Sequence, residues 1–489
     1  MIFRRLGALL VGTAALCAGP ALGGPPFQPP GANLTLGNLS HTLPVQGAMG
    51  NPAAASAWPA DAARGSNRGT GFTGSAGLEY GNLDNIFEFY DRITGGYTPS
   101  DPDDGGGGDP GDGDDDDGID LGEIWDRLDP DIQDAVTSVA EEIATQAALL
   151  ALVSEEGYGK AWLTADLPWL TGYDGLGGTW TARLNWSGAS RAFGLAEGIS
   201  FDTDAARMAL EDWFDTLPID RPEVFPIDDQ VELIVDPETN SVAMRIANDS
   251  SIVTKSTQTT QLSVGYSRPT WSFGGGTLHV GTTANLYFMQ LSRASVRFGD
   301  VTDSKELFDE IRNADFTSDT RFGLDVGALW VGRNVQLGAQ VTNLNEPEFA
   351  FPGVDLSPYS APDIIDFLER DRVYTMDRQL TVEASVFDEK RRWSAHLGYE
   401  VDPVTDPLGD RFQWLTASAA FTTDAWWLPS LRAGYRENLA GTGLSYVTAG
   451  ATLFKYVNLD LASAFDTVRI EGRDLPQGVM VSLGFQIGW

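Results

Sequence analysis

The chain has 489 residues, a formal net charge of −37 and a single cysteine, Cys17. The acidic excess argues against nucleic acid as a partner, because phosphates would be repelled. One thiol leaves no intrachain disulfide and no cysteine metal site. The 55 glycines, 10% aromatic residues and 42% hydrophobic residues favour one large closed sheet of short strands over several ordinary domains.

Residues 1–23 have the pattern of an export signal peptide. Arg4 and Arg5 give a charged start, and Leu6 to Leu16 form an apolar run. We therefore expect the protein to leave the cytoplasm. The run is too short to span a bilayer, and no later apolar stretch reaches the roughly 18 residues that a transmembrane helix needs. Lipid attachment at Cys17 is the alternative, and the bulky residue before it disfavours that alternative.

Residues 24–70 are predicted to form a plug segment. The stretch LGNLSHTLPVQGAMGNPAAASAW, residues 36–58, is apolar and rich in turn residues, and it precedes the first predicted strand. A mobile linker is the bland interpretation, but the apolar content favours a segment tucked into a barrel. The residues expected to move and to contact a ligand are Gly50, Asn51, Pro52 and Ala53.

Residues 71–94 are predicted as the first strand and a short connection, and residues 95–122 as an acidic loop of low complexity. The run from Asp101 to Glu123 has the composition of a solvated, disordered segment. It also has the ligand spacing of an EF-hand calcium loop, although Asp117 stands where that loop needs a glycine. Calcium is the one cofactor that the sequence suggests, with these ligands: Asp112, Asp114, Asp116, Asp120 and Glu123.

Three stretches have helical patterns. Residues 123–154 carry apolar side chains at helical spacing, and shorter helices are expected near 204–216 and 304–313. Helices are not expected in the lipid-exposed wall of a barrel, so these belong in loops, at a barrel mouth or in the lumen. Val231 to Ile246 reads as a hairpin, and its membership of the wall stays open.

Residues 155–489 are predicted to form the main barrel. Segments such as 322–330, 335–342, 380–386 and 393–399 alternate apolar residues with small or polar ones. In a soluble sandwich the apolar face packs inward, whereas in a closed membrane barrel it faces lipid. We predict an all-β, transmembrane antiparallel barrel of about 14 strands. A soluble periplasmic sandwich or propeller is the alternative.

Two features favour lipid. The last segment, residues 478–489, alternates and ends on an aromatic residue, so Phe485 and Trp489 are expected to be read by the barrel-assembly machinery. Aromatic residues also collect at segment ends, as in the interfacial girdles of membrane barrels. The expected girdle consists of Trp162, Trp169, Trp180, Trp271, Tyr287, Phe298, Trp414, Trp426, Trp427 and Tyr435.

The sequence predicts no catalytic residue and no enzyme. Residues 73–77, TGSAG, approach the G-x-S-x-G motif but lack its first glycine and its strand-to-helix context. His41, His279 and His396 are scattered, and neither a phosphate-binding loop nor a zinc spacing is present. His396 is expected to face the lumen beside Glu383 or Glu400, where a carboxylate pair is one interpretation and a hydrogen-bond network of the lumen is the favoured one.

Four stretches carry a resemblance to a family: MGNPAAASAW (49–58), GLEYGNLDNIFEFYDRI (77–93), VGRNVQLGAQVTNLNEPEF (331–349) and LRAGYREN (431–438). Together they resemble the conjugal-transfer TraF-like exported proteins, which are akin to FadL-type and PorV-type outer-membrane barrels. The resemblance implies a barrel of roughly 14 strands in the outer membrane with the Asn-Pro-Ala segment in its lumen. The chain has no C-x-x-C motif, so it departs from the thioredoxin-like proteins that share the TraF name.

Two functions from different classes follow. As a scaffold, the barrel would be a component of an envelope-spanning transfer or secretion apparatus and bind other proteins of it. As a FadL-like passive transporter, it would carry small hydrophobic molecules. Outer-membrane lipid and the barrel-assembly machinery are expected partners in both cases. The polar inner face modestly favours the scaffold; its residues are Asp325, Gln336, Gln340, Glu383 and Glu400.

Overall fold

The computed structural model describes residues 31–41, 44–57, 69–81, 158–195, 197, 223–226, 231–236, 241–246, 249–297, 314–370, 372–423, 425–470 and 473–488. Several predicted features lie outside these residues: the signal peptide, the calcium loop, the helices at 123–154, 204–216 and 304–313, and Phe298 and Trp489. Within the described residues, no helix has the length and apolar character needed to cross a membrane.

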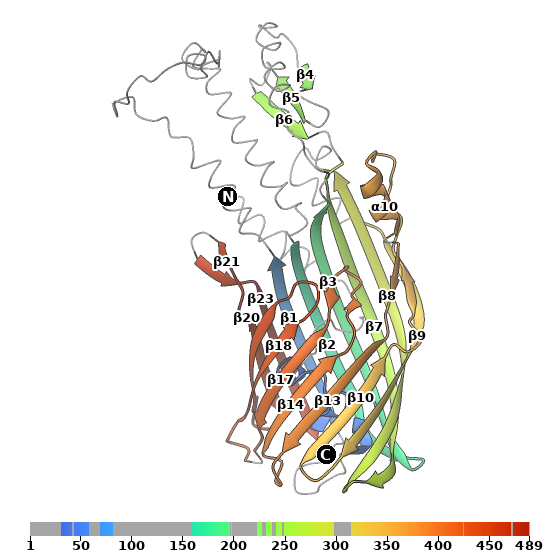
Figure 1. Ribbon diagram of the computed structural model, residues 1–489, viewed down its shortest axis with the longest axis vertical. Coiled ribbons are helices and arrows are strands. Elements are labelled where there is room, and N and C mark those ends of the chain that lie inside the picture. The colour runs from blue at the N-terminus through green and yellow to red at the C-terminus, as the bar shows by residue number, and fades with distance from the viewer. Residues whose placement is uncertain are drawn as a thin grey trace, which may run out of the picture.

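Fourteen strands close into one antiparallel barrel, which confirms the predicted fold class (Figure 1). The first and last strands complete the ring by pairing from Gly69 with Gly488 to Glu79 with Gly478. In order around the ring the strands are β1 (Gly69–Gly81), β2 (Tyr158–Gly175), β3 (Gly178–Leu195), β7 (Ser251–Phe273), β8 (Gly276–Arg297), β9 (Phe316–Val331), β10 (Val335–Thr342), β13 (Gln379–Phe387), β14 (Trp393–Glu400), β17 (Trp414–Phe421), β18 (Ser430–Asn438), β19 (Ser445–Leu453), β20 (Val457–Ala464) and β23 (Gly478–Gly488).

The two ends of the barrel differ. At the turn end, where β2 meets β3 and β7 meets β8, the connections are tight; Leu176 and Gly177, with φ of 56° and 76°, make one of them. The opposite end, here called the loop end, receives the long connections. Because the strand number is even and every pair is antiparallel, β1 begins and β23 ends at the turn end (Figure 1).

The other small sheets and short helices are not part of the barrel sheet. The hairpin predicted at 231–246 forms a separate three-stranded sheet instead of joining the wall. That sheet consists of β4 (Glu223–Pro226), β5 (Val231–Asp236) and β6 (Ser241–Ile246). The remaining elements are the pairs β11 (Glu348–Ala350) with β12 (Val373–Thr375), β15 (Val404–Thr405) with β16 (Arg411–Phe412), and β21 (Thr467–Ile470) with β22 (Arg473–Pro476), together with helices α2 (Asn33–Leu36), α3 (Pro44–Gly47), α4 (Ala54–Ala57) and α10 (Pro362–Arg370).

The strands of the barrel differ greatly in length. Strand β7 has 23 residues and β8 has 22, whereas β10, β14 and β17 have 8 each. At about 3.3 Å per residue, β7 is roughly 75 Å long and β10 roughly 26 Å long. The long strands therefore rise past the short ones on one side of the barrel (Figure 1).

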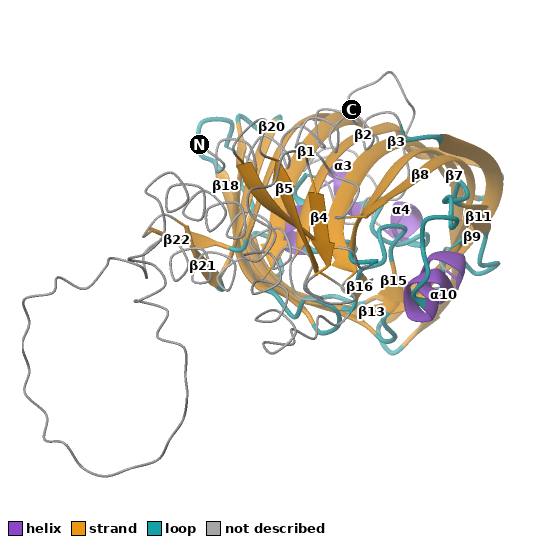
Figure 2. Ribbon diagram, turned by 90° about the horizontal axis from the view of Figure 1, so that it is seen from above, coloured by secondary structure: helices purple, strands orange, loops and turns teal. Residues whose placement is uncertain are grey.

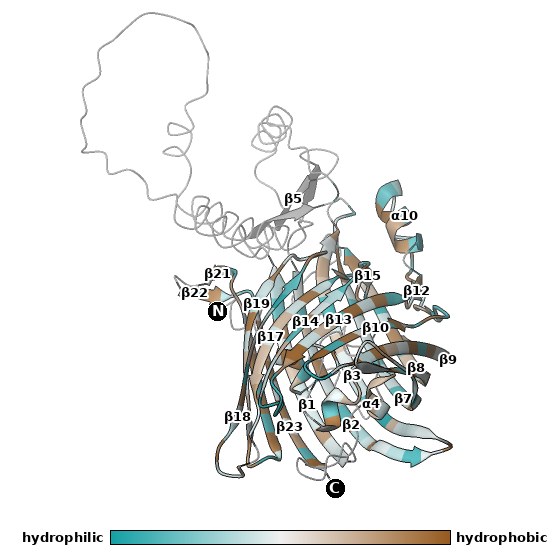
Figure 3. Cartoon of the chain, turned by 60° about the horizontal axis from the view of Figure 1, so that its bottom comes forward, coloured by the Kyte–Doolittle hydropathy of each residue, from teal (hydrophilic) through white to brown (hydrophobic). Residues whose placement is uncertain are grey.

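The faces of the wall are inverted relative to a soluble sheet. On β23 the outward residues Val481, Leu483 and Phe485 are 42–59% exposed, while the inward Met480 and Ser482 are at most 2% exposed. Bands of hydrophobic and hydrophilic colour alternate along the strands in Figure 3. The apolar side chains thus face away from the lumen, as the alternation predicted.

Aromatic residues collect outside the barrel at the turn end. Trp271 is 66% exposed there, and ring pairs such as Trp393 with Phe421, whose centroids are 4.8 Å apart, link neighbouring strands. We call this set the aromatic belt: Trp169, Tyr173, Trp271, Phe273, Trp330, Trp393, Phe421, Trp426, Trp427, Phe454, Tyr456 and Phe485.

The girdle prediction was wrong for three residues. Trp162, Tyr287 and Trp414 are only 4%, 2% and 8% exposed, and they point into the barrel. The reason is parity along the strand: Trp162 shares its face of β2 with the buried Lys160 and Thr164. Position near a strand end did not decide the side on which these rings lie.

Candidate functional site

Residues 31–41 and 44–57, here called the plug, lie inside the ring of strands. Figure 2 shows α3 and α4 within the barrel when it is viewed from above. The plug is bonded to separate parts of the wall: Gly31 N donates to Ser482 Oγ on β23 (2.8 Å), and Ser56 N donates to Ser267 Oγ on β7 (3.0 Å). Thr35 Oγ1 adds a bond of 2.6 Å to Asp460 on β20. Three strands separate β23 from β7, so the two ends of the plug are fixed at different places around the ring.

Glu383 on β13 is the main anchor of the plug. Its buried carboxylate accepts hydrogen bonds from Ser40 N (2.7 Å), Ser40 Oγ (3.1 Å) and Asn51 Nδ2 (2.9 Å). The next inward residue of the neighbouring strand, Gln336, donates from Nε2 to Ser40 O (2.9 Å). Hydrogen bonds to a charged acceptor are about twice as strong as neutral ones, so two turns of the plug depend on one side chain.

Wall glycines create room for the plug. A Cβ at Gly281 would lie 2.1 Å from Pro52 O, and one at Gly327 would lie 2.2 Å from Asn51 Oδ1. Gly398 and Gly434 face Leu39 and Thr35 in the same way, with a Cβ 2.6 and 2.5 Å from the nearest atom. The plug backbone reaches the wall at Gly281 and Gly434, and plug side chains lie against the wall backbone at Gly327 and Gly398. A larger residue at these positions would displace the plug.

The structure brings together the four residues predicted for the plug. Asn51 uses both ends of its amide: Nδ2 donates to Glu383 and to Ala339 O (3.3 Å), and Oδ1 accepts from Ala53 N (2.9 Å). Ala53 is fully buried in a cluster with α4 and Leu329 of the wall. Gly50, Asn51 and Pro52 line a cavity, whereas Ala53 does not.

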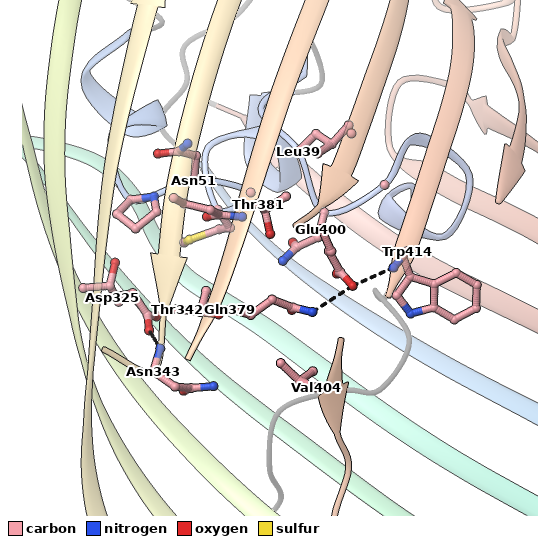
Figure 4. Close-up of a pocket in the computed structure, with 18 of the residues that line it drawn as sticks. Leu39, Asn51, Asp325, Thr342, Asn343, Gln379, Thr381, Glu400, Val404 and Trp414 are labelled. Atoms are coloured by element: carbon pink, nitrogen blue, oxygen red, sulfur yellow. Dashed lines mark hydrogen bonds between the residues drawn. The ribbon is translucent and has the colours of Figure 1, made fainter. Parts of the chain in front are cut away.

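That cavity, here called the lumen pocket, has a volume of about 240 Å³ and lies between the plug and the loop end (Figure 4). Its wall is mostly polar. Glu400 Oε2 accepts from Trp414 N (2.8 Å) and Gln379 Nε2 (2.9 Å), and Asp325 accepts from Asn343 N (2.9 Å). Aromatic rings supply the apolar area: Tyr287, Tyr374, Tyr399, Phe412 and Trp414.

Two buried donors on the pocket wall stand out. Trp414 Nε1 and Arg436 Nε have no hydrogen-bond partner within the part of the chain that the structure describes. The Arg436 guanidinium lies 4.3 Å from the centroid of the Trp414 ring, so both belong to one patch of the lining. Buried polar groups nearly always have a partner, so this patch suits a ligand that brings an acceptor atom.

A connection at the loop end closes the pocket on its other side. Residues 401–413, here called the loop-end hairpin, contain β15 and β16, and Val404 and Phe412 of the hairpin line the pocket. Leu408 at its tip is fully buried in a cluster that includes Leu34 of the plug and Trp162 of the wall. Nothing in the sequence analysis singled out this hairpin.

The three histidines lie apart from any carboxylate pair. His396 bonds through Nδ1 to Ser385 Oγ (2.8 Å) and through Nε2 to Ser394 Oγ (2.9 Å), so it belongs to a hydrogen-bond network in the lumen, as predicted, and does not pair with Glu383 or Glu400. His279 Nδ1 meets Ser56 Oγ at 3.0 Å. The ring of His396 turns to the neighbouring hydroxyls because they stand on its own inward face.

His41 belongs to the plug. Its Nε2 lies 2.6 Å from Asn33 Oδ1. Burial, with further contributions from His396 and Arg432, holds the pKa of His41 well below its ordinary value of 6.5. The neutral form of this ring is therefore the one that the docked plug accommodates.

Residues 73–77, the TGSAG stretch that approaches the G-x-S-x-G motif, lie in the middle of β1. Ser75 Oγ meets Ser482 Oγ of β23 at 2.6 Å, inside the wall. The strand continues to Gly81, so the sharp strand-to-helix turn of a nucleophile elbow is not made here. Among the described residues, no three histidine, cysteine, aspartate or glutamate side chains gather as a metal site.

Comparisons with known proteins were made for sequence and fold. Residues 48–399 match the family model TraF_2, described as "F plasmid transfer operon, TraF, protein". This match confirms the resemblance noted in the sequence. No curated protein sequence matches the chain.

Solved structures with a similar fold include two forms of a hydrocarbon channel. A TodX deletion mutant, titled a monoaromatic hydrocarbon channel, is 9% identical with a TM-score of 0.43 and covers 94% of this chain and 99% of its own. A Pseudomonas aeruginosa FadL homologue is 11% identical with a TM-score of 0.39 and covers 96% and 99%. The Pseudomonas putida toluene transporter TodX is 10% identical with a TM-score of 0.34 and covers 96% and 98%.

Proposed function

The chain belongs to the TraF_2 family, and we propose that it is an outer-membrane barrel that binds a small solute in its lumen pocket and passes it when the plug shifts. The observation that carries this proposal is a pocket inside a closed barrel, with the plug on one side and the loop-end hairpin on the other. In this function the protein is passive: it catalyses no reaction and needs no cofactor.

Placement in the outer membrane is supported by the outer surface of the barrel. Its apolar face points away from the lumen, and a belt of exposed rings encircles the turn end. Exposed rings at one level are typical of a membrane–water boundary, where an aromatic side chain keeps its body in the acyl region and its polar edge in water. The inward-facing polar strand positions fit a water-accessible lumen.

The pocket lining supports a solute with both ring-stacking and hydrogen-bonding groups. Tyr287, Tyr374 and Trp414 offer flat apolar faces, while Trp414 Nε1 and Arg436 Nε are donors without a partner among the described residues. A purely aliphatic molecule offers these donors no acceptor, whereas a solute with a polar group can supply one. The proposed solute is therefore amphipathic, which narrows the expectation of a small hydrophobic molecule.

Native mass spectrometry tests this proposal on protein gently extracted from its own outer membrane. A stoichiometric small-molecule adduct is expected, and the Trp414→Leu variant should lose most of it. The matched control is Trp427→Leu, because Trp427 is 68% exposed on the outside of the barrel. A barrel without an adduct in the parent protein, or an adduct that survives Trp414→Leu unchanged, would contradict solute binding in this pocket.

A second candidate function is a component or scaffold of an envelope-spanning transfer apparatus. The description of the family model, which names the F plasmid transfer operon, favours it. In this function the plugged lumen is permanently closed and the barrel serves as an anchor for other proteins. The same mass spectrometry separates the two, because a scaffold would retain a second polypeptide at fixed stoichiometry and carry no small molecule.

A further inference from the structure

The tip of the loop-end hairpin is a rigid turn buried in the lumen. Asp406 Oδ1 accepts from Leu408 N and from Asp410 N, both at 2.9 Å, and Gly409 N donates to Asp406 O at 3.0 Å. Gly409 has a φ of +91°, which favours glycine. The two aspartates are thereby held on one tight turn, 2% and 8% exposed.

Two basic side chains of the wall, on β2 and β3, form ion pairs with this turn. Lys160 Nζ on β2 lies 2.6 Å from Asp406 Oδ2 and 2.7 Å from Asp410 Oδ2, so one ammonium joins both carboxylates. Arg191 on β3 adds an ion pair of 2.9 Å to Asp410 Oδ1, and its Nη1 donates to Leu408 O at 3.4 Å. We call this cluster the latch.

The latch spans the barrel. The hairpin connects β14 to β17, whereas Lys160 and Arg191 stand on β2 and β3. Five strands separate β3 from β14 on one side of the ring, and five separate β17 from β2 on the other. The hairpin therefore crosses the lumen and is fastened to the opposite wall.

The latch also borders the lumen pocket, since Val404, Thr405 and Asp406 belong to the pocket wall. Withdrawing the hairpin removes that wall and opens the pocket toward the loop end. The plug closes the other side through separate contacts, centred on Glu383. The pocket thus has two closures with different chemistry.

We propose that the loop-end hairpin is a second gate, and that the Lys160–Asp406–Asp410–Arg191 latch must break before the pocket exchanges with the loop end. Buried ion pairs suit this role, because removing one partner leaves the others charged and uncompensated, and the closed state is then strongly disfavoured. The gate rests on the proposed function only in that the pocket receives a solute.

The test measures access to the pocket and needs no solute. A reporter cysteine replaces Thr381, a pocket-lining residue on β13, in a Cys17→Ala background that removes the only other thiol. The rate of modification by a charged, water-soluble methanethiosulfonate is followed in the purified full barrel. Lys160→Met should raise this rate at least tenfold, and Lys160→Arg, which keeps the charge, should raise it much less.

Two further variants keep the test decisive. Arg333→Met is the matched control, because Arg333 makes an exposed ion pair of 2.6 Å with Glu389 at the turn end and should leave the rate unchanged. If Lys160→Met does not assemble, as judged by heat-modifiable migration in gels, Asp410→Asn weakens the same latch with a side chain of the same shape. Rates within twofold of the parent in an assembled latch variant would overturn the gate.

Labelling of the reporter and passage of a solute are separate readouts. Because labelling is read without transport, a barrel that carries no solute but shows these rate changes would refute the proposed function and keep the gate. Solute passage with unchanged labelling would do the reverse.

Discussion

The dependence of the plug on Glu383 gives the sharpest prediction. Glu383→Ala removes an acceptor that receives three hydrogen bonds, two from Ser40 and one from Asn51, at 2.7 to 3.1 Å. The barrel strand itself should survive, because Glu383 pairs with Gly338 and Gly398 through its backbone. The change therefore acts on the contact between plug and wall.

The size of the effect follows from the number of bonds lost. Each hydrogen bond to a charged group contributes about 1.5–3 kcal/mol, and part of that is recovered when water reaches the freed donors. A loss of about 3–6 kcal/mol in docking free energy corresponds to a shift of the docked-to-released ratio by roughly 100-fold to 10,000-fold.

Hydrogen exchange measured by mass spectrometry reads this ratio directly. Backbone amides of residues 33–57 that exchange through plug release should do so at least 100-fold faster in Glu383→Ala, with the barrel strands unchanged. Glu389→Ala is the matched control, since Glu389 is exposed and makes its ion pair outside the lumen. Plug amides that stay within threefold of the parent would refute the anchoring role of Glu383.

Three other perturbations are predicted. Gly281→Ala should displace the plug and lower the unfolding temperature, because its Cβ would lie 2.1 Å from Pro52 O; Gly74→Ala, whose nearest atom would be 3.9 Å away, should be tolerated in the same melt. Protection of the plug amides from hydrogen exchange should weaken as the pH falls below about 6.5, because His41 becomes protonated in the released plug and stays neutral in the docked plug. His41→Gln should make this protection less dependent on pH. Leu461→Arg, on the 51% exposed outer face five residues from the belt residue Tyr456, should cost about 2–4 kcal/mol of folding in lipid vesicles, and an unchanged free energy would argue against lipid there.

The wall could be predicted from the sequence because its signal is local. Alternation with a period of two marks each strand and also the face on which each residue lies. Every second residue of a strand lies on the same face, and this count would have placed Trp162 and Trp414 inside, whereas their nearness to a strand end did not. Trp162 is two residues from the inward Lys160, and Trp414 is two residues from the inward Thr416. That information was present in the sequence.

The latch could not be predicted in this way. The stretch DPVTDPLGD, residues 402–410, announces a tight turn, but a surface loop has the same composition. Its burial depends on Lys160 and Arg191, which are more than 200 positions earlier and meet it only when the ring closes. A single sequence carries no signal for such a pairing across the lumen.

If the barrel spans the outer membrane as proposed, the unequal strand lengths and the aromatic belt together set its position there. The belt at the turn end would lie at one membrane boundary, and any strand length beyond the roughly 25 Å apolar band would emerge beyond the other boundary. Strands β7 and β8, with 23 and 22 residues, would then extend into water on one side of the barrel, while the 8-residue strands would end near the lipid headgroups. In the proposed function, the mouth of the lumen is tilted and a solute would reach it from the low side.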